Sequence, residues 1–271
     1  MYDLHSHTYY SDGTDSPSEL IANAASAGIE LLGVTDHDTM AGIPEAITAA
    51  AEHKLPLLCG AEIEAAFSEK LHILGLGVDP QARCIREMLS RQAERRQERN
   101  ERMLDKLAQA GYDVRHCYIP GRGCTTRTHV AAALVRAGFA KDTADAFRRL
   151  IGRSSPLFVA CEHPTMAETV ACINEAGGVA VIAHPCKMRC DHAELIRELA
   201  DCGLWGVEAY YPGFGEETTE YFVGLAKRFG LHVTCGSDYH GGYRPGSPLG
   251  CAWRDAEELA ESYSILKELA I

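Results

Sequence analysis

Short apolar runs alternate with amphipathic segments along most of the chain. The runs predict strands at residues 3–7, 31–35, 56–59, 71–77, 179–183, 206–209 and 232–235. Between most of them, apolar residues three or four apart predict helices at 16–28, 43–53, 167–176, 193–202 and 218–229. Ser16-Pro17-Ser18-Glu19 supplies the N-cap, first-turn proline and capping-box glutamate that begin a helix. Seven strands linked by helices favour a parallel α/β barrel.

The alternation stops between about residues 80 and 160. A long charged helix is predicted at 81–111, followed by helices at 128–137 and 143–151. We therefore predict a helical insertion at 80–160 between the two parts of a barrel domain, 1–79 and 161–271. Within the long helix, Glu94, Glu98 and Glu101 alternate with arginines at spacings that make internal ion pairs. A solvated helix face is expected there rather than a nucleic-acid surface.

Composition narrows the class of protein. The chain has 271 residues with 46% hydrophobic content, enough to bury a full core. Its formal net charge of -12 excludes a general electrostatic affinity for nucleic acid, so a phosphate-bearing substrate needs local positive charge, which metal ions can supply. No apolar run has the length of a membrane span, and Asp3 and His5 lie where a signal peptide would be basic and then apolar. We expect a cytosolic protein whose scattered cysteines are reduced.

Residues that can bind metal follow most of the apolar runs. Successive side chains of a strand point to opposite faces, so His5 and His7 point the same way and can hold one ion. The other candidates are Asp12 after this pair, His72 at the start of its run, and His37, Glu62, His184, Glu208, Asp238 and His240 at or just beyond strand ends. In parallel barrels the C-terminal strand ends form the active site. Imidazoles and carboxylates without thiolates suit catalytic Zn, Mn or Fe rather than a closed structural zinc site.

Six ordered motifs carry a resemblance to a known family. They are His5-Ser6-His7 with Ser11-Asp12-Gly13, Thr35-Asp36-His37-Asp38, Gly60-Ala61-Glu62, His72-Ile73-Leu74-Gly75, Ala183-His184-Pro185 and Gly236-Ser237-Asp238-Tyr239-His240. In these motifs the chain resembles the polymerase and histidinol phosphatase (PHP) family over essentially its whole length. Thr126-Arg127-Thr128-His129 is similar to the cap of the TrpH/YciV branch, which includes 3',5'-nucleotide bisphosphate phosphatases and the 5'-to-3' exoribonuclease RNase AM.

The resemblance implies a distorted seven-stranded (β/α)7 barrel with up to three divalent ions, Mn being the first expectation and Fe or Zn the alternatives. It assigns His5, His7, Glu62 and Asp238 to the first ion, Glu62, His72 and His184 to the second, and Asp12, His37 and His240 to the third. Glu62 would bridge two ions, which together can activate water for in-line attack on phosphorus. We expect Asp36 and Asp38 to orient a ligand or cap the next turn, and Glu208 to support the site without binding metal.

The predicted insertion supplies candidate substrate contacts. Arg127 and His129 lie at the predicted start of a helix, where free N–H groups and the helix dipole favour an anion. Arg127 is expected to make a bidentate phosphate contact, and His129 to orient the scissile phosphate or protonate the leaving oxygen.

Two segments depart from the pattern of relatives. Relatives commonly show Gly-Lys-x-Gly-Tyr-Val where this chain has Ser154-Ser155-Pro156-Leu157-Phe158-Val159, so one lysine is missing. They also commonly carry Gly-Arg-Tyr where Cys186-Lys187-Met188 stand, and Lys187 keeps the charge without the planar fork of arginine. These departures concern the substrate rather than the metal ligands.

The predicted activity is that of a metal-dependent phosphoesterase. We expect it to remove the 3'-phosphate of nucleoside 3',5'-bisphosphates and to trim short RNA from its 5' end. The alternatives are a small-metabolite phosphatase, such as histidinol phosphatase, and a non-catalytic metal-binding module, against which the complete ligand set argues. The sequence has no Walker A loop, dinucleotide-binding glycine motif or Gly-x-Ser-x-Gly elbow. It indicates no membrane association and no protein partner.

Overall fold

Seven strands form one sheet in chain order, and the sheet curls until its first and last strands meet. The computed structural model describes every residue from Met1 to Ile271. The strands are β1 (Tyr2–Asp3), β2 (Leu31–Val34), β3 (Leu57–Ala65), β4 (Leu71–Leu76), β5 (Val179–Ile182), β6 (Gly206–Tyr210) and β7 (His232–Cys235). The N–H of Leu4 donates to the carbonyl of Cys235 at 3.2 Å, and Ser6 forms a parallel bridge with Tyr239. The result is a nearly closed barrel.

One strand runs against the others. β1, β2 and β3 are parallel, as are β5, β6 and β7, but β4 is antiparallel to both β3 and β5. The prediction of a wholly parallel barrel is therefore wrong at this strand. Only residues 66–70 separate β3 from β4, which is too short for a crossover to a parallel strand. The reversal brings the start of β4 to the barrel end where β3 finishes.

The first strand is also shorter than predicted. Beyond Asp3 the backbone bonds to side chains as well as to neighbouring backbone: the N–H of Ser6 donates to Thr35 Oγ1 at 3.2 Å, and that of Thr8 to Asp36 Oδ1 at 2.8 Å, while the N–H of His7 donates to the carbonyl of Tyr239 at 2.9 Å. His5 and His7 thus lie in the segment that follows β1, and both are completely buried.

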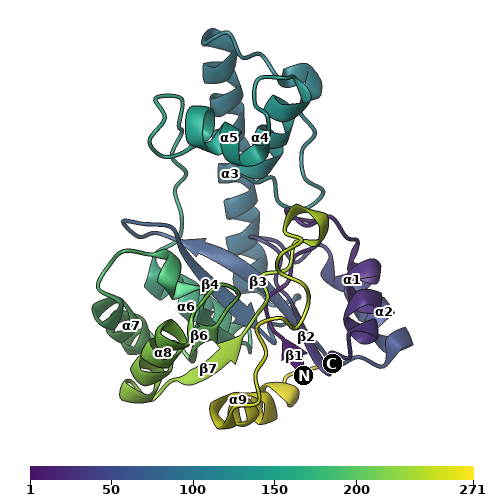
Figure 1. The fold of residues 1–271 in the computed structure, drawn as a ribbon, viewed down its shortest axis with the longest axis vertical. Helices are drawn as coiled ribbons and strands as arrows, with labels where there is room; N and C mark the ends of the chain where they lie inside the picture. Colours follow the sequence, from purple (N-terminus) through teal and green to yellow (C-terminus); the bar gives the residue numbers. More distant parts are fainter.

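Six helices surround the barrel (Figure 1). They are α1 (Pro17–Ser26), α2 (Ile43–His53), α6 (Met166–Glu175), α7 (His192–Asp201), α8 (Glu216–Arg228) and α9 (Glu257–Lys267), the last of which had no sequence prediction. The predicted capping box of α1 is present, because Ser16 Oγ accepts from the Glu19 N–H at 3.1 Å and Glu19 Oε2 accepts from the Ser16 N–H at 2.8 Å. No helix combines the length and apolar character needed to cross a bilayer, and all cysteines are free thiols.

The remaining helices form a cap above the barrel (Figure 1). They are α3 (Arg83–Gln109), α4 (Arg127–Arg136), α5 (Thr143–Ala146) with the π-helical turn Phe147–Ile151, and the short turn Arg115–Cys117. Ile85 and Met88, near the start of α3, belong to the barrel core, whereas Met103 and Leu107 pack with α4 in a separate core. One continuous helix therefore links two hydrophobic cores.

The arginine-rich part of α3 is only in part the solvated face that the sequence predicts: Glu94, Glu98 and Glu101 are exposed, but two of the arginines are not. Arg96 and Arg99 are each only 4% exposed. They lie with Gln92, Asn100 and Met103 on a buried stripe whose three- and four-residue spacing continues through the middle of the helix. The glutamates do not pair with these arginines; Glu101 binds Arg115 instead, at 2.8 Å. The stripe faces the junction between cap and barrel, which is why it is polar and still buried.

Candidate metal centre

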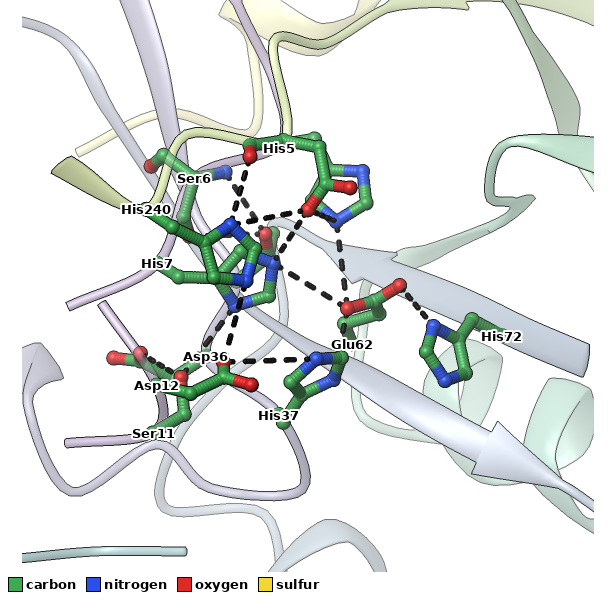
Figure 2. Close-up of polar contacts among 12 residues, drawn as sticks. His5, Ser6, His7, Ser11, Asp12, Asp36, His37, Glu62, His72 and His240 are labelled. Atoms are coloured by element: carbon green, nitrogen blue, oxygen red, sulfur yellow. Dashed lines mark hydrogen bonds and ion pairs between the residues drawn. The ribbon is translucent and has the colours of Figure 1, made fainter. Parts of the chain in front are cut away.

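The nine predicted metal ligands meet at one end of the barrel, and Figure 2 labels all of them except His184 and Asp238. They come from the segments after β1, β2, β5 and β7 and from β3 and β4: His5, His7, Asp12, His37, Glu62, His72, His184, Asp238 and His240. All are buried except Asp12, which is partly exposed. His72 reaches this end although it opens its strand, because β4 is antiparallel. Six separate parts of the chain thus converge on one region.

The side-chain atoms fall into four sets whose members lie within 4.8 Å of one another. The sets are His5, His7 and Asp238; His5, Glu62 and His184; His37, Glu62 and His72; and His7, Asp12, His37 and His240. Glu62 belongs to two of them. Its Oε1 lies 2.9 Å from His184 Nε2 and its Oε2 lies 2.8 Å from His37 Nδ1, while Figure 2 shows it between His5, His37 and His72. This central position is the one that a bridging ligand needs.

Buried atoms that make no hydrogen bond test whether metal ions fit these residues. Seven such atoms, all completely enclosed, belong to the proposed ligands: Nε2 of His5, His7, His72 and His240, Nδ1 of His37, Oδ1 of Asp12 and Oε2 of Glu62. A buried polar atom without a hydrogen bond is costly, and such atoms are rare in native structures. A shared interaction with cations would satisfy all of them, so the donor set fits divalent metal.

At Glu62 and His7, electrostatics favours the protonation states that metal binding requires. Burial alone would raise the pKa of Glu62, but the His37, His72 and His5 imidazoles hold it well below its usual range. Burial and the neighbouring His240 lower the pKa of His7 to about 3. Ionised carboxylates and neutral imidazoles are the forms that donate electron pairs to a metal. The pKa of His5 is instead raised, since Glu208, Glu62 and Asp238 outweigh its burial.

Glu208 supports the centre from behind, as predicted. Its Oε1 lies 2.9 Å from His5 Nδ1, and its Oε2 accepts from the N–H of His184 at 2.7 Å. This one carboxylate on β6 thereby fixes the His5 ring, after β1, and the backbone of His184, after β5. This leaves His5 Nε2 to face the cluster.

Asp36 and Asp38 also lie outside the four sets and hold the surrounding loops. Asp36 accepts from the N–H of Thr8 at 2.8 Å and from Ser11 Oγ at 2.5 Å. Asp38 accepts from the N–H of Glu64 at 3.2 Å and forms an ion pair with Arg96 of the cap. The orienting role expected for both residues therefore agrees with their contacts.

Two of the candidate ligands have unusual backbone conformations. His184 has φ 32° and Asp238 has φ 52°, in the left-handed region that ordinary side chains seldom adopt. Such strain persists where the surrounding structure imposes it, and it is concentrated at functional sites. Here it turns both side chains toward the cluster at the ends of β5 and β7.

A cavity of ≈ 310 Å³ opens beside the cluster, and its lining contains no hydrophobic residue. Besides the candidate ligands, it is lined by Glu69, Lys70, Arg153, Lys187 and Arg244. Lys187, the predicted contact, reaches it, but its Nζ donates to Asp238 Oδ2 at 3.1 Å and lies 4.4 Å from the centre of the Tyr211 ring. Sequence reasoning missed the other three cations. Lys70 was detectable in principle, because it stands two positions before His72 and so shares its strand face.

The two predicted cap residues lie on different sides of the first turn of α4. Arg127 lines a small cavity together with Asp12, His37 and Lys70. His129 lines a separate cleft, and its Nδ1 accepts from the N–H of Thr126 at 3.1 Å in the capping box of α4. Between them, Thr128 Oγ1 donates to Asp12 Oδ2 at 3.2 Å. That contact, absent from the predictions, joins the cap directly to a candidate ligand.

Several curated proteins match this chain over most of both lengths and are about one third identical to it. A 5'-3' exoribonuclease of Haemophilus influenzae is 34% identical over 88% of this chain and 89% of its own length. A 3',5'-nucleoside bisphosphate phosphatase of Chromobacterium violaceum is 33% identical over 92% and 90%. A phosphoribosyl 1,2-cyclic phosphate 1,2-diphosphodiesterase of Eggerthella lenta is 33% identical over 88% and 94%. Identity alone does not separate these three substrates.

The fold agrees with that of a solved protein. The structure of an amidohydrolase from Chromobacterium violaceum, with bound sulfate, superposes with a TM-score of 0.89 at 31% identity, covering 100% of this chain and 97% of the other. A family model, the PHP domain, matches residues 3–156 and so more than half of the sequence. The ordered histidine and carboxylate motifs, their convergence at one barrel end and these likenesses show that the chain belongs to the PHP domain family and is a hydrolase of the phosphoesterase type.

Proposed function

We propose that this protein hydrolyses phosphate esters of nucleotides, releasing the 3'-phosphate of nucleoside 3',5'-bisphosphates and trimming short RNA from its 5' end. The observation that carries the proposal is the wholly polar cavity beside the ligand cluster, with Lys70, Arg153, Lys187 and Arg244 in its lining. In a chain of net charge -12, cations gathered at this point indicate an anionic substrate. The names of two relatives support a nucleotide as the carrier of that anion.

The metal assignment is part of the proposal. His5, His7, Glu62 and Asp238 would hold one ion, Glu62, His72 and His184 a second, and Asp12, His37 and His240 a third. In the structure Glu62 groups with His184 and with His72 in two separate sets, and His7 joins the third group. Mn is the first candidate, and the same ligand types accept Fe or Zn. When bound, such ions supply an activated water and neutralise charge on the phosphate oxygens.

Residues of the cap would hold the substrate in line with these ions. Arg127 is suited to bind phosphate oxygens, because its guanidinium lies over the rings of Phe147 and Phe158 and pairs with no carboxylate. Burial lowers the pKa of His129, so its imidazole is neutral near pH 7. With Nδ1 already accepting a hydrogen bond, Nε2 carries the proton and can donate it in a hydrogen bond that orients the phosphate. Lys187, beside Asp238, would add a positive charge that attracts the phosphate.

The cap, residues 80–160, would decide which substrate reaches the barrel. The barrel segments 1–79 and 161–271 supply every proposed metal ligand, whereas Arg127 and His129 come from the cap. Ser155, which stands where relatives commonly carry lysine, is used locally: its Oγ donates to the carbonyl of Leu150 at 2.6 Å. Lys70 and Arg153 place positive charge at the cavity in spite of that missing lysine.

A substrate panel tests this proposal. Phosphate or nucleotide release by Mn-loaded protein is measured with adenosine 3',5'-bisphosphate, AMP, histidinol phosphate, phosphoribosyl 1,2-cyclic phosphate and a short 5'-phosphorylated RNA. We expect the bisphosphate and the RNA to give the highest kcat/KM. Glu62→Gln should lower kcat by more than about 100-fold, since even supporting groups of metal sites cost 10- to 100-fold when removed.

The outcomes separate the alternatives. Preference for histidinol phosphate or the cyclic phosphate would contradict the nucleotide as substrate. It would still agree with metal-dependent hydrolysis of a phosphate ester. Full activity of metal-replete Glu62→Gln would contradict the bridging role of Glu62. No turnover of any substrate would favour a non-catalytic metal-binding module.

A further inference from the structure

One strand of the barrel contributes no proposed metal ligand. The ligands come from the other six strands or from the segments that follow them, whereas β6 (Gly206–Tyr210) supplies none. Its carboxyl end still reaches the centre, because Glu208 bonds to two of the ligands there. Tyr211, the first residue after the strand, reaches a third ligand, Asp238, through its hydroxyl. The end of β6 therefore supports ligands instead of adding one.

The carboxylate of Asp238 has two sides with different surroundings. Oδ1 faces other proposed ligands, 3.3 Å from His7 Nε2 and 3.6 Å from His5 Nε2. Oδ2 faces away from them and accepts hydrogen bonds from three donors: Tyr211 Oη at 2.5 Å, Lys187 Nζ at 3.1 Å and Arg244 Nη1. Because a carboxylate oxygen offers about two lone pairs, these donors leave none on Oδ2 for a metal ion. An ion bound by the two imidazoles therefore meets Oδ1.

Tyr211 is the one of the three donors that is fixed in place. The side chains of Lys187 and Arg244 are 43% and 42% exposed, and both line the cavity beside the ligands. Tyr211 is outside that lining. Its ring lies edge-on to His184 with 5.6 Å between the ring centres, and 5.0 Å from the ring centre of Phe214. Exposed charged side chains exchange partners with water at little cost, whereas a ring packed between two others keeps its hydroxyl in position.

We propose that Tyr211 is a positioning residue of the metal centre: its hydroxyl holds Oδ2 of Asp238, so that Asp238 binds its ion through Oδ1 alone. The inference rests on the metal assignment within the proposed function. Groups of this kind orient a ligating carboxylate, and their removal lowers metal affinity by about 10- to 100-fold. In this role Tyr211 touches neither the substrate nor the metal.

Tyr211→Phe removes the hydroxyl and keeps the ring. Binding of Mn to the metal-free protein is measured by calorimetric titration, and activity is measured as a function of free Mn. One Mn site should weaken by about 10- to 100-fold, and the Mn concentration that gives half of the maximal kcat should rise by the same factor. The KM for adenosine 3',5'-bisphosphate at saturating Mn should stay within about twofold of wild type, because no substrate contact is removed.

Tyr210→Phe is the matched control, one position earlier in the chain. The Tyr210 hydroxyl donates to Glu258 Oε1 of α9 at 3.1 Å, so the same group is removed from a carboxylate that is not a proposed ligand. The Mn affinity of this variant should be unchanged within about twofold. A folded Tyr211→Phe protein that binds Mn as tightly as wild type, or as tightly as a weakened Tyr210→Phe protein, would overturn the inference.

A structure of the Mn-loaded wild type tests the same point without a variant. It should show Oδ1 of Asp238 on the ion and Oδ2 still bonded to the Tyr211 hydroxyl. An ion held by both oxygens, or a hydroxyl turned away from Oδ2, would contradict the positioning role. If wild type binds Mn but hydrolyses no phosphate ester, the proposed activity fails, and the Mn affinities of the two variants still decide this inference. If wild type binds no Mn, both fail.

Discussion

Single positions show how closely the metal centre is fitted. A Cβ atom at Gly236 would lie 2.3 Å from His5 Cβ and 2.4 Å from Glu208 Oε1. The glycine thus allows β7 to pass directly behind the ring that Glu208 orients. Its place in the Gly-Ser-Asp-Tyr-His motif is a steric necessity of this packing.

Gly236→Ala should therefore damage both stability and metal binding. Overpacking of this kind costs about 1 to 3 kcal/mol and would displace His5 from the cluster. We expect a melting temperature several degrees lower and a reduced Mn content after dialysis, measured by calorimetry and metal analysis. Gly224→Ala is the control, since a Cβ there meets nothing within 4 Å and alanine favours the surrounding helix α8. Equal melting temperatures and Mn contents for the two variants would contradict the packing argument.

At the scale of elements, α3 holds cap and barrel together through a buried ion network. Arg96 on this helix pairs with Asp38 and with Glu64, whose Oε2 lies 3.2 Å away. Asp38 follows His37 directly, so the network connects the cap to a candidate ligand. Glu64 further approaches His163, with 3.5 Å between Oε1 and Nε2.

Removal of Arg96 should be strongly destabilising. Breaking a buried pair leaves an uncompensated charge and costs about 3 to 5 kcal/mol, so Arg96→Met should lower the free energy of unfolding by that amount. Arg83→Met removes the exposed pair with Glu87 on the same helix and should lower the free energy of unfolding far less, because solvent screens that pair. Urea denaturation of both variants measures the difference. A small effect at Arg96 would show that the network contributes little to stability.

The elements also show where sequence reasoning succeeds and where it fails. Most strands and helices were predictable, because the spacing of apolar residues and the identity of capping residues are local signals. The capping box of Ser16 and Glu19 is an example. The direction of β4 depends on the short connection 66–70, and the burial of Arg96 and Arg99 depends on what the barrel presents to them. Neither the direction of β4 nor the burial of these arginines can be read from the residues of that strand or helix alone. The convergence of the ligand motifs was predictable, since strand ends share an edge, whereas the contributions of Thr128 and Arg153 depend on how the cap meets the barrel.

For the whole molecule, the metal centre should act as a source of stability. It concentrates enclosed histidines and carboxylates at one barrel end, and seven of their atoms make no hydrogen bond within the protein. An ion that binds only the folded state stabilises it by mass action. Removal of metal should therefore weaken the entire fold rather than the site alone.

Chelation and reconstitution measure this contribution. Dialysis against EDTA should lower the melting temperature, and Mn added at about 100 times its Kd should restore about 2.7 kcal/mol. Glu62→Gln should respond to Mn less than wild type, because two of the four ligand sets lose an anionic oxygen. An unchanged melting temperature for wild type across EDTA and Mn would contradict the metal assignment.

The continuity of α3 has a consequence for how substrate comes and goes. The helix runs from Arg83 to Gln109 without proline or glycine, and its two ends are fixed in two different cores. Sharp bends in helices occur at such residues, so α3 offers no hinge about which the cap could swing as a lid. We therefore expect the cap to keep its place above the barrel, and substrate to enter and leave through the clefts that border α4 without a swing of the cap.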